Sequence, residues 1–379
     1  MKQFIQFLCF LLTSQVCFAQ RDLVQDIDAV FNQYASAEHV YGAVLQVYSA
    51  SRDIDVSVYK NNPSSNLMDA GHQPFYTASI TKLLTATAIG ILKDRKQLDF
   101  DDTIDQYLPE ALIDNLHVLD GNDYSNTITI AQLLQHTAGL PDYFTDSTMD
   151  GSPNIINQLL IDQDNLWAPQ DLIRFTKETM RPHFVPGQGY HYTDTDYVLL
   201  ALIIENVSGV SLDGFFKHSI FEPLGMEHSY VNLKSDPIKD ALPIAAFYVG
   251  DIELSSFKSL SADWGGGGLV STTQDLIRFF KAYNNDQIIK QDTRLEMQHW
   301  VHETVGMTYG FGIRKVSLKD RFHTATALHL IGHTGSTASF LWYCPQLDTY
   351  IAGTLNQLEA SKQTLSLVYK ILKTIQNKQ

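Results

Sequence analysis

A serine and a lysine three residues apart, Ser79 and Lys82, are the first residues in this chain whose types and spacing could do chemistry. If both lie at the start of a helix, their side chains share one face of it, one turn apart. A lysine buried there can lose its proton and accept one from the serine hydroxyl, which makes a weak nucleophile an acylating one. The pair therefore predicts a serine that attacks a carbonyl carbon.

Two later triplets could complete such a site. The first holds Tyr192 and Asp194, and a tyrosine from another segment can share the base role with the lysine. The second is His333, Thr334 and Gly335, which we expect on a strand at the edge of a sheet, where it could hold a substrate carboxylate. Together the three motifs predict a nucleophile, a base and a substrate-binding strand.

Each motif alone is weak evidence, because the sequence offers competitors. Ser255 and Lys258 have the same spacing as the first pair, in a stretch without a helical pattern. Tyr124 begins a triplet that resembles the second motif, but it lies in a polar, turn-rich stretch. Tyr192 instead follows a proline-glycine turn and precedes the apolar run at residues 197–204, which predicts a buried helix. The context favours Tyr192 over Tyr124.

The order of the three motifs resembles the serine β-lactamase and penicillin-binding-protein superfamily, which has a serine-x-x-lysine followed by two later elements. The likeness is to its class C-like members, the D-Ala-D-Ala carboxypeptidases of type B, D-aminopeptidases and related esterases. Segments 133–140, 221–226 and 266–272 extend it over essentially the whole chain after residue 19. It implies an α+β, β-lactamase/DD-peptidase-like fold: an antiparallel sheet flanked by helices, with an inserted, mostly helical domain and the active site between them.

The resemblance also implies a role for each motif residue. Ser79 would attack the carbonyl, while Lys82 and Tyr192 would take up its proton and return one to the leaving group. The tetrahedral oxyanion would lie between the backbone amides of Ser79 and Ser336. The residues expected to bind substrate are Asp194, His333, Thr334, Gly335 and Ser336.

Two departures from the family pattern bear on the substrate. His333 stands where most β-lactamases of this superfamily have lysine, and a histidine is only fractionally charged near neutral pH. Asp194 stands where asparagine is more common, and a carboxylate only accepts hydrogen bonds. Asp194 could pair with Lys82, which would raise the pKa of the lysine and shift the base role towards Tyr192, or with a cationic group of the substrate. Both changes weaken the case for efficient β-lactam hydrolysis.

We therefore expect a serine hydrolase that acts through an acyl-enzyme on Ser79, first of all a D-amino-acid-specific peptidase of the D-Ala-D-Ala carboxypeptidase kind. The alternatives are an esterase or β-lactamase of the same superfamily, and a non-catalytic penicillin-binding or sensing module. A small-molecule or peptide substrate is the expected partner. The leaving group and the oligomeric state stay open, because the motifs do not determine them.

The sequence also predicts an export signal and the division of the chain into domains. Residues 1–19 have a charged start, an apolar stretch and a small-x-small end, which is typical of a secretory signal, so we expect a secreted or periplasmic protein. The residue before Cys17 is not small, which argues against lipid attachment there. The hydrolase domain would cover 20–379, with a sheet lobe from about 20–78 and 262–379 and a helical lobe from about 79–261.

Hydrophobic patterning predicts the main elements that position the motifs. They are a helix over 22–36, a hairpin over 43–59, a motif helix over 79–94, a helix over 273–283, strands near 310–316, 327–331 and 340–344, and a final helix from about 361. No stretch after the signal reaches about 18 apolar residues, so no membrane span is expected.

Other features exclude several function classes. The net charge of −15 argues against nucleic-acid binding, which needs a basic face. The glycine run at 265–268 lacks the motif of a phosphate cradle, so close backbone packing is the better interpretation. The 13 histidines show no paired ligand spacing, so we expect no metal and no cofactor. His136 is interpreted as a hydrogen-bonded histidine in a turn, and Cys344 as a buried structural thiol.

Overall fold

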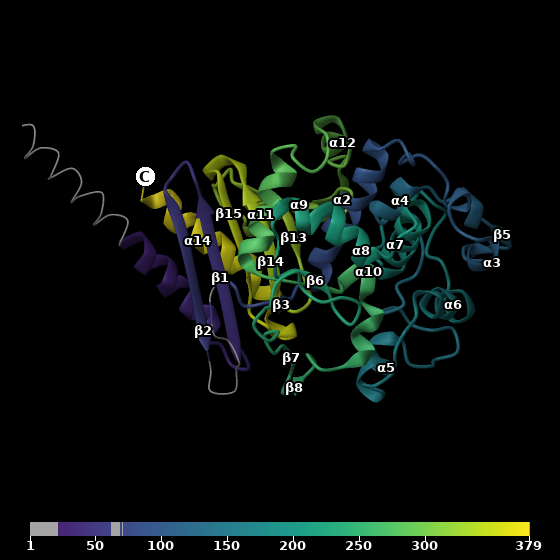
Figure 1. Ribbon diagram of the computed structural model, residues 1–379, viewed down its shortest axis with the longest axis horizontal. Helices are drawn as coiled ribbons and strands as arrows, with labels where there is room; N and C mark the ends of the chain where they lie inside the picture. The colour runs from purple at the N-terminus through teal and green to yellow at the C-terminus, as the bar shows by residue number, and fades with distance from the viewer. Residues whose placement is uncertain (1–21, 62–68, 70, 379) are drawn as a thin grey trace, which may run out of the picture.

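The computed structural model describes residues 22–61, 69 and 71–378, so the predicted signal peptide lies outside the described residues (Figure 1). In the described part of the chain, eight strands form one antiparallel sheet in the order β10-β11-β12-β13-β14-β15-β1-β2. The strands are β1 (Gly42–Ser49), β2 (Ile54–Asn61), β10 (Val301–Thr304), β11 (Met307–Tyr309), β12 (Arg314–Ser317), β13 (His329–Thr334), β14 (Ser339–Cys344) and β15 (Thr349–Thr354). Both ends of the chain therefore contribute to the sheet.

The first hairpin forms as its alternating sequence predicts. Strands β1 and β2 pair in register from Gly42 opposite Asn61 to Ser49 opposite Ile54. The turn includes Asp53 with a φ of 54°, a conformation that aspartate tolerates better than most residues. Side chains alternate between the two faces, because successive residues of a strand point in opposite directions.

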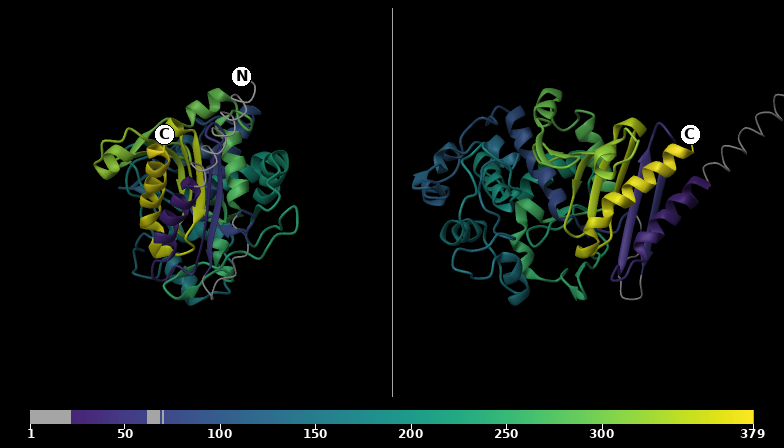
Figure 2. Two further views of the ribbon diagram at one scale, coloured as in Figure 1. Left: turned by 90° about the vertical axis from the view of Figure 1, so that its left-hand side faces the viewer. Right: turned by 180° about the vertical axis from the view of Figure 1, so that it is seen from behind.

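Helices cover both faces of the sheet (Figure 2). The helix at residues 22–35 and α14 (Thr364–Asn377) pack on one face, where they form an apolar cluster with inward side chains of β1, β14 and β15. Helices α2 (Thr81–Asp94) and α11 (Thr273–Asn284) pack on the other face. The sheet is therefore a buried middle layer, and α2, which follows Ser79, is anchored against it.

Helices α4 (Ile130–Leu134), α6 (Pro169–Thr179) and α8 (Leu212–Phe216) gather at the other end of the molecule, to the right in Figure 1, around the buried helix α7 (Asp194–Ser208). The run at 197–204 predicted this helix, and its side chains are buried apart from a partly buried end. A three-stranded sheet connects the two ends, in the order β3 (Phe75–Tyr76), β9 (Leu269–Ser271) and β6 (Tyr230–Val231). Since β6 lies inside the predicted helical lobe, the division into two lobes stays a prediction.

The structure corrects two expectations about strands. The triplet that begins at His333 ends β13, which is not an edge strand, because β12 pairs with it from Arg314 opposite Gly332 to Ser317 opposite His329. Of the strand predicted near 310–316, only the last part is a strand, β12, and residues 310–313 form the turn between β11 and β12. Gly312 separates them with a φ of +69° and leaves no room for a Cβ beside helix α2. The strand that covers β13 is also the one that brings Arg314 to the motif.

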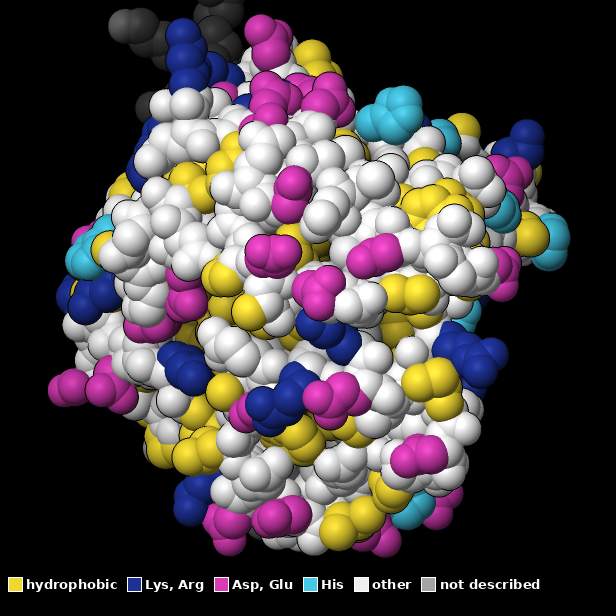
Figure 3. Space-filling model, turned by 90° about the vertical axis from the view of Figure 1, so that its right-hand side faces the viewer, with side chains coloured by type: hydrophobic (Ala, Val, Ile, Leu, Met, Phe, Trp, Pro, Cys, Tyr) yellow, Lys and Arg dark blue, Asp and Glu magenta, His cyan; other side chains and the backbone are white. Residues whose placement is uncertain are grey.

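The surface at the helical end of the molecule is of mixed charge. The face in Figure 3, at the helical end of the molecule, carries acidic and basic side chains interspersed among apolar ones. Among the described residues, no single helix is long and apolar enough to cross a membrane. The helices Asp194–Ser208 and Leu212–Leu224 reach that length and apolar composition only when taken together, and the chain bends by 73° between them.

Candidate active site

Ser79 lies in a short 3-10 turn (Ala78–Ile80) that leads directly into helix α2. Ala78, just before it, is buried and has a φ of 47°, which a residue with a side chain adopts only when its surroundings hold it there. One such restraint comes from Ser339 in β14, whose hydroxyl donates to the Thr77 carbonyl at 2.6 Å. The sheet thus fixes the backbone that presents the serine.

Lys82 is completely buried, and its ammonium contacts the serine and two acceptors. Nζ lies 3.4 Å from Ser79 Oγ, 2.5 Å from Asp194 Oδ1 and 3.0 Å from the Gly266 carbonyl. Burial alone would lower the pKa of Lys82, but the Asp194 carboxylate and Tyr192 together outweigh it, and the pKa is raised. Of the two pairings considered for Asp194, the one with Lys82 is present.

Tyr192 is the tyrosine that meets this pair. Its ring centroid lies 4.9 Å from Lys82 Nζ and 4.9 Å from Arg314 Cζ, so it stands between two cations. Its hydroxyl is buried and has no hydrogen-bond partner of ordinary geometry among the described residues. Burial raises the pKa of Tyr192, although Lys82 and Arg314 act in the opposite direction and Ser79 also favours the phenolate. The hydroxyl is therefore placed to exchange a proton with Ser79 and Lys82.

Further buried carboxyls surround the lysine. Asp142 accepts a hydrogen bond from the backbone N–H of Asp194 at 3.0 Å, and Asp263 accepts one from the Tyr76 hydroxyl at 2.9 Å. Burial, and then repulsion by Asp194, raises the pKa of Asp142 to about 6 and that of Asp263 to about 7. The Lys82 ammonium thus pairs with Asp194, while Asp142 and Asp263 resist ionisation.

His333 does not supply a charge to the site. A carbonyl oxygen only accepts, so Nδ1 donates to the Thr334 carbonyl at 2.7 Å, and Nε2 then accepts from the Tyr309 hydroxyl at 3.1 Å. Burial, together with Arg314 and Lys82, holds the pKa of His333 well below its ordinary value. A neutral histidine with both ring nitrogens in use positions its neighbours but cannot hold a carboxylate by charge.

Arg314 supplies the cation that the third motif lacks, and the sequence analysis missed it. Its Nε and Nη2 bind Glu303 at 2.8–3.0 Å, which leaves Nη1 pointing to Thr334 Oγ1 at 3.4 Å. Its side chain is only 12% exposed. No motif marks Arg314; only the predicted strand near 310–316 could have suggested it, had its pairing with β13 been known.

The glycine run confirms the packing interpretation. It forms the short helix α10 (Trp264–Gly267). A Cβ on Gly265 would lie 2.4 Å from Ala201 Cβ, and one on Gly266 would lie 2.3 Å from Asp194 Oδ1. The run therefore allows the backbone to approach the lysine and its carboxylate closely, and it supplies one of the acceptors of Lys82.

The turn after β13 lies against the serine. A Cβ on Gly335 would meet the Thr77 carbonyl at 2.2 Å and Ala78 Cβ at 2.9 Å. Ser336 follows immediately and is exposed. The motif is thus beside Ser79, while the oxyanion hole formed by the amides of Ser79 and Ser336 stays a prediction.

His136 is buried in a turn after a short helix, as predicted, and it contacts Tyr192, the candidate catalytic tyrosine. Its Nδ1 lies 3.0 Å from Asp196 Oδ2 and accepts from the Thr193 N–H at 3.3 Å. Its ring centroid is 4.3 Å from that of Tyr192. Burial holds the pKa of His136 well below its ordinary value, so it acts as a neutral packing partner of the tyrosine.

The competing motifs lie elsewhere. Tyr124 packs edge-on against His117 with 5.6 Å between ring centroids, and Lys258 forms an exposed ion pair with Asp164. Cys344 is buried in β14, and burial raises the pKa of its thiol to about 11, so it remains a structural thiol. The fold therefore brings Ser79, Lys82 and Tyr192 together and leaves these alternatives out.

Comparison with known protein families identifies the family of this chain. The family model described as Beta-lactamase matches residues 27–373. The chain belongs to the beta-lactamase family. It is 32% identical over 256 residues to penicillin-binding protein 4* of Bacillus subtilis (strain 168), covering 63% of this chain and 51% of that protein, so it spans about half the length of this curated relative.

Solved structures share the fold. The D-amino acid amidase from Ochrobactrum anthropi SV3, complexed with L-phenylalanine, superposes with a TM-score of 0.76 at 21% identity, covering 94% of this chain and 99% of that chain. EstCE1, a hydrolase with promiscuous acyltransferase activity, gives 0.71 at 19% identity, covering 93% and 100%. The predicted fold class and superfamily are confirmed, and the fold is that of serine hydrolases.

Proposed function

We propose that this protein is a serine hydrolase that forms an acyl-enzyme on Ser79 and cleaves substrates whose leaving group carries a free carboxylate, as a D-amino-acid-specific peptidase does. Ser79 Oγ attacks the carbonyl carbon, and its proton passes to the Lys82–Tyr192 pair and from there to the leaving amine. Water then hydrolyses the ester. The D-amino acid amidase among the structural relatives supports a D-amino-acid substrate, while the carboxylate on the leaving group is argued from Arg314 below.

The observation that carries this proposal is the orientation of Arg314. Two of its nitrogens are occupied by Glu303, but Nη1 points to Thr334 at the end of the motif strand. A carboxylate bound there would gain a charge-assisted hydrogen bond from a permanent cation and a second bond from the threonine hydroxyl. A substrate whose terminal carboxylate binds Thr334 would have its scissile bond near Ser79, because the next turn packs on the backbone before the serine.

The Lys82–Asp194 ion pair argues against rapid β-lactam turnover. With its pKa raised, the lysine is held protonated near neutral pH, so deprotonation of the pair limits both acylation and deacylation. This effect supports a slow acyl-enzyme more than an efficient β-lactamase. It fits the preference for a peptidase over a β-lactamase that the sequence suggested.

The test compares an N-acylated D-Ala-D-Ala peptide with its C-terminal amide and with the L-Ala-L-Ala peptide. We expect kcat/KM to favour the D-peptide with the free carboxylate, and Arg314→Gln to lower kcat/KM for that peptide about tenfold or more, equivalent to about 1.4 kcal/mol or more. The same variant should change turnover of the amide far less. Equal losses on both substrates would contradict carboxylate recognition by Arg314.

A second candidate is an esterase, which the bond between Arg314 and Glu303 favours. That pair is neutral overall, so the cleft also accommodates uncharged esters. The relative EstCE1 is described as a hydrolase with acyltransferase activity. Turnover of p-nitrophenyl esters without turnover of any D-peptide would select this candidate. Acylation by penicillin without turnover of any substrate would select the penicillin-binding module.

We also propose that the protein is exported to the periplasm or the outside of the cell. The support is the composition of residues 1–19, which lie outside the described residues. Mass spectrometry of the protein recovered from its native host tests this proposal. A chain beginning at Gln20 is expected, and an uncleaved chain in the cytoplasm would contradict it.

A further inference from the structure

Three potential metal ligands, Asp146, His183 and His191, lie close together near the loop before Tyr192. None of them belongs to the active site around Ser79. Asp146 Oδ2 lies 2.7 Å from His183 Nε2 and 2.9 Å from His191 Nε2, and the three ligand atoms all lie within 4.8 Å of one another. The two imidazole rings lie close together, with 3.7 Å between their centroids and an angle of 32° between their planes. Two histidines thus direct the same ring nitrogen at one carboxylate oxygen.

The backbone holds these side chains in place before any ligand binds. The N–H of His183 donates to the Gly139 carbonyl and that of His191 to the His136 carbonyl, both at 2.9 Å. The N–H of Asp142 donates to Asp146 Oδ2 at 2.8 Å. All three ligands are therefore tied to one continuous segment, 136–146, which is the kind of support a metal site requires.

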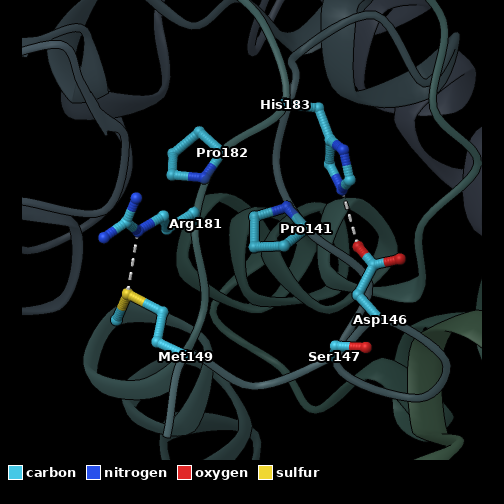
Figure 4. A pocket seen from close by; sticks show the side chains of 7 residues that line it. All are labelled: Pro141, Asp146, Ser147, Met149, Arg181, Pro182 and His183. Carbon is cyan, nitrogen blue, oxygen red and sulfur yellow. Dashed lines mark hydrogen bonds and ion pairs between the residues drawn. The ribbon is translucent and has the colours of Figure 1, made fainter.

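The cluster opens onto a pocket rather than into the core (Figure 4). His183 and Asp146 face each other on one side of it, while Arg181, bound to Met149, lies on the other side beyond Pro141 and Pro182. The ligand side chains are between 21% and 39% exposed, so solvent can reach them. A bound cation would have room for a water molecule as a further ligand.

We propose that Asp146, His183 and His191 form a binding site for Zn²⁺, with water in the fourth position. Two imidazoles and one carboxylate are a common donor set for zinc, with bonds of about 2.0–2.2 Å. Tetrahedral bonds of that length separate ligand atoms by about 3.3 Å, so the two contacts need to widen by about 0.5 Å. To bind the metal, each Nε2 that donates to the carboxylate must present a lone pair, so its proton moves to Nδ1 in a neutral imidazole or is released to solvent from an imidazolium.

We expected no metal site from the sequence, because the two histidines are eight residues apart and the aspartate lies 37 residues before the first. The fold, rather than a local motif, brings them together. Bound zinc would connect the 136–146 segment to the residues just before Tyr192, since His191 is the neighbour of that tyrosine. The site would therefore brace the segment that presents Tyr192, without touching the reacting atoms.

The experiment is calorimetric titration of untagged full-length protein with Zn²⁺ near pH 7. We expect one saturable site per chain. In His183→Ala the dissociation constant should rise about 10- to 100-fold or more, because loss of even an outer-shell partner of a metal ligand weakens binding by that factor. His218→Ala is the matched control, since His218 forms a similar 3.0 Å contact with Glu222 but has no third ligand; its affinity should equal that of the wild type. Zinc should raise the melting temperature of the wild type and of the control only.

Co²⁺ provides a readout that does not depend on variants. Bound at a four-coordinate nitrogen and oxygen site, it should develop visible absorption that one equivalent of Zn²⁺ removes. Asp146→Asn, which preserves the volume of the side chain, should abolish that absorption in a protein that remains folded by circular dichroism. Absence of saturable zinc binding to the wild type, or equal weakening in His218→Ala, would overturn the proposal.

Discussion

Replacing Asp194 by asparagine removes the carboxylate that holds the Lys82 proton. The Asp194 side chain lies 2.5 Å from Lys82 Nζ in an almost fully buried pair, and an asparagine at this position would keep its shape and one acceptor oxygen. Without the negative charge, burial again dominates and the pKa of Lys82 falls. The pKa of Tyr192 falls as well, because Asp194 raises it too. The direction of the change is thus the same whichever residue accepts the serine proton.

The size of the effect follows from the contact. An opposite charge within 4–6 Å shifts a pKa by about 1–3 units, or about 1.4–4 kcal/mol. At pH 7 the variant would hold about 10- to 1000-fold more of the deprotonated pair. A base of lower pKa also accepts the serine proton less readily. If this loss offsets about half of the gain in deprotonated pair on a logarithmic scale, acylation becomes about 3- to 30-fold faster at pH 7.

The assay is the second-order acylation rate of Ser79 by an activated ester between pH 5 and pH 11. We expect the midpoint of the acidic limb to move about 1–3 units lower in Asp194→Asn. The matched control is Asp99→Asn, which removes a carboxylate from an exposed pair with Lys93 at 2.9 Å and should leave the profile unchanged. A midpoint that stays in place or rises, in a variant that is folded, would refute the assignment of Lys82 and Tyr192 as the base pair.

Three more predictions concern the surroundings of this pair. In Gly266→Ala, the new Cβ would lie 2.3 Å from Asp194 Oδ1 and displace that carboxylate, so we expect the free energy of unfolding to fall by about 1–3 kcal/mol. Asp263 has a pKa of about 7 against the ordinary 3.8, so its stabilising contribution is complete below pH 3.8 and is lost as the pH rises through 7. Asp263→Asn should therefore gain up to about 4 kcal/mol in free energy of unfolding relative to the wild type between pH 4 and pH 8. Glu303→Gln leaves the cation of Arg314 unpaired, and it should lower KM for a carboxylate substrate but not for its amide.

Denaturant unfolding and steady-state kinetics check these three variants. Gly71→Ala is a suitable control for the first, because a Cβ there meets nothing closer than 3.8 Å. An unchanged free energy of unfolding in Gly266→Ala would contradict the close packing of Gly266 against the Asp194 carboxylate. A stability difference in Asp263→Asn that does not vary with pH would contradict the buried, protonated acid. Equal changes in KM for both substrates of Glu303→Gln would contradict carboxylate binding at Arg314.

Much of the fold could be predicted because its signals are local. The helix at 22–35, the first hairpin, α7 and α11 have apolar periodicities that match their burial. Motif spacing and context identified Ser79, Lys82 and Tyr192. Each of these inferences needed only the residue itself and its neighbours in sequence.

What the sequence could not provide depends on pairing between distant segments. Strand β12 is four residues long and has no pattern that predicts its pairing with β13, so neither the covered edge nor Arg314 could be anticipated. The neutral state of His333 follows from Tyr309 and from burial, which its own motif does not reveal. The cluster of Asp146, His183 and His191 likewise arises from the backbone contacts of segment 136–146.

Intact-protein mass spectrometry with a penicillin tests the central claim, that Ser79 is an acylated nucleophile served by a slow base pair. Wild-type protein and Ser79→Ala are followed side by side over time. We predict a single adduct of the mass of the penicillin on the wild type, persisting for many minutes, and none on Ser79→Ala. An adduct on both proteins, or rapid loss of penicillin with only a fleeting adduct on the wild type, would contradict the account.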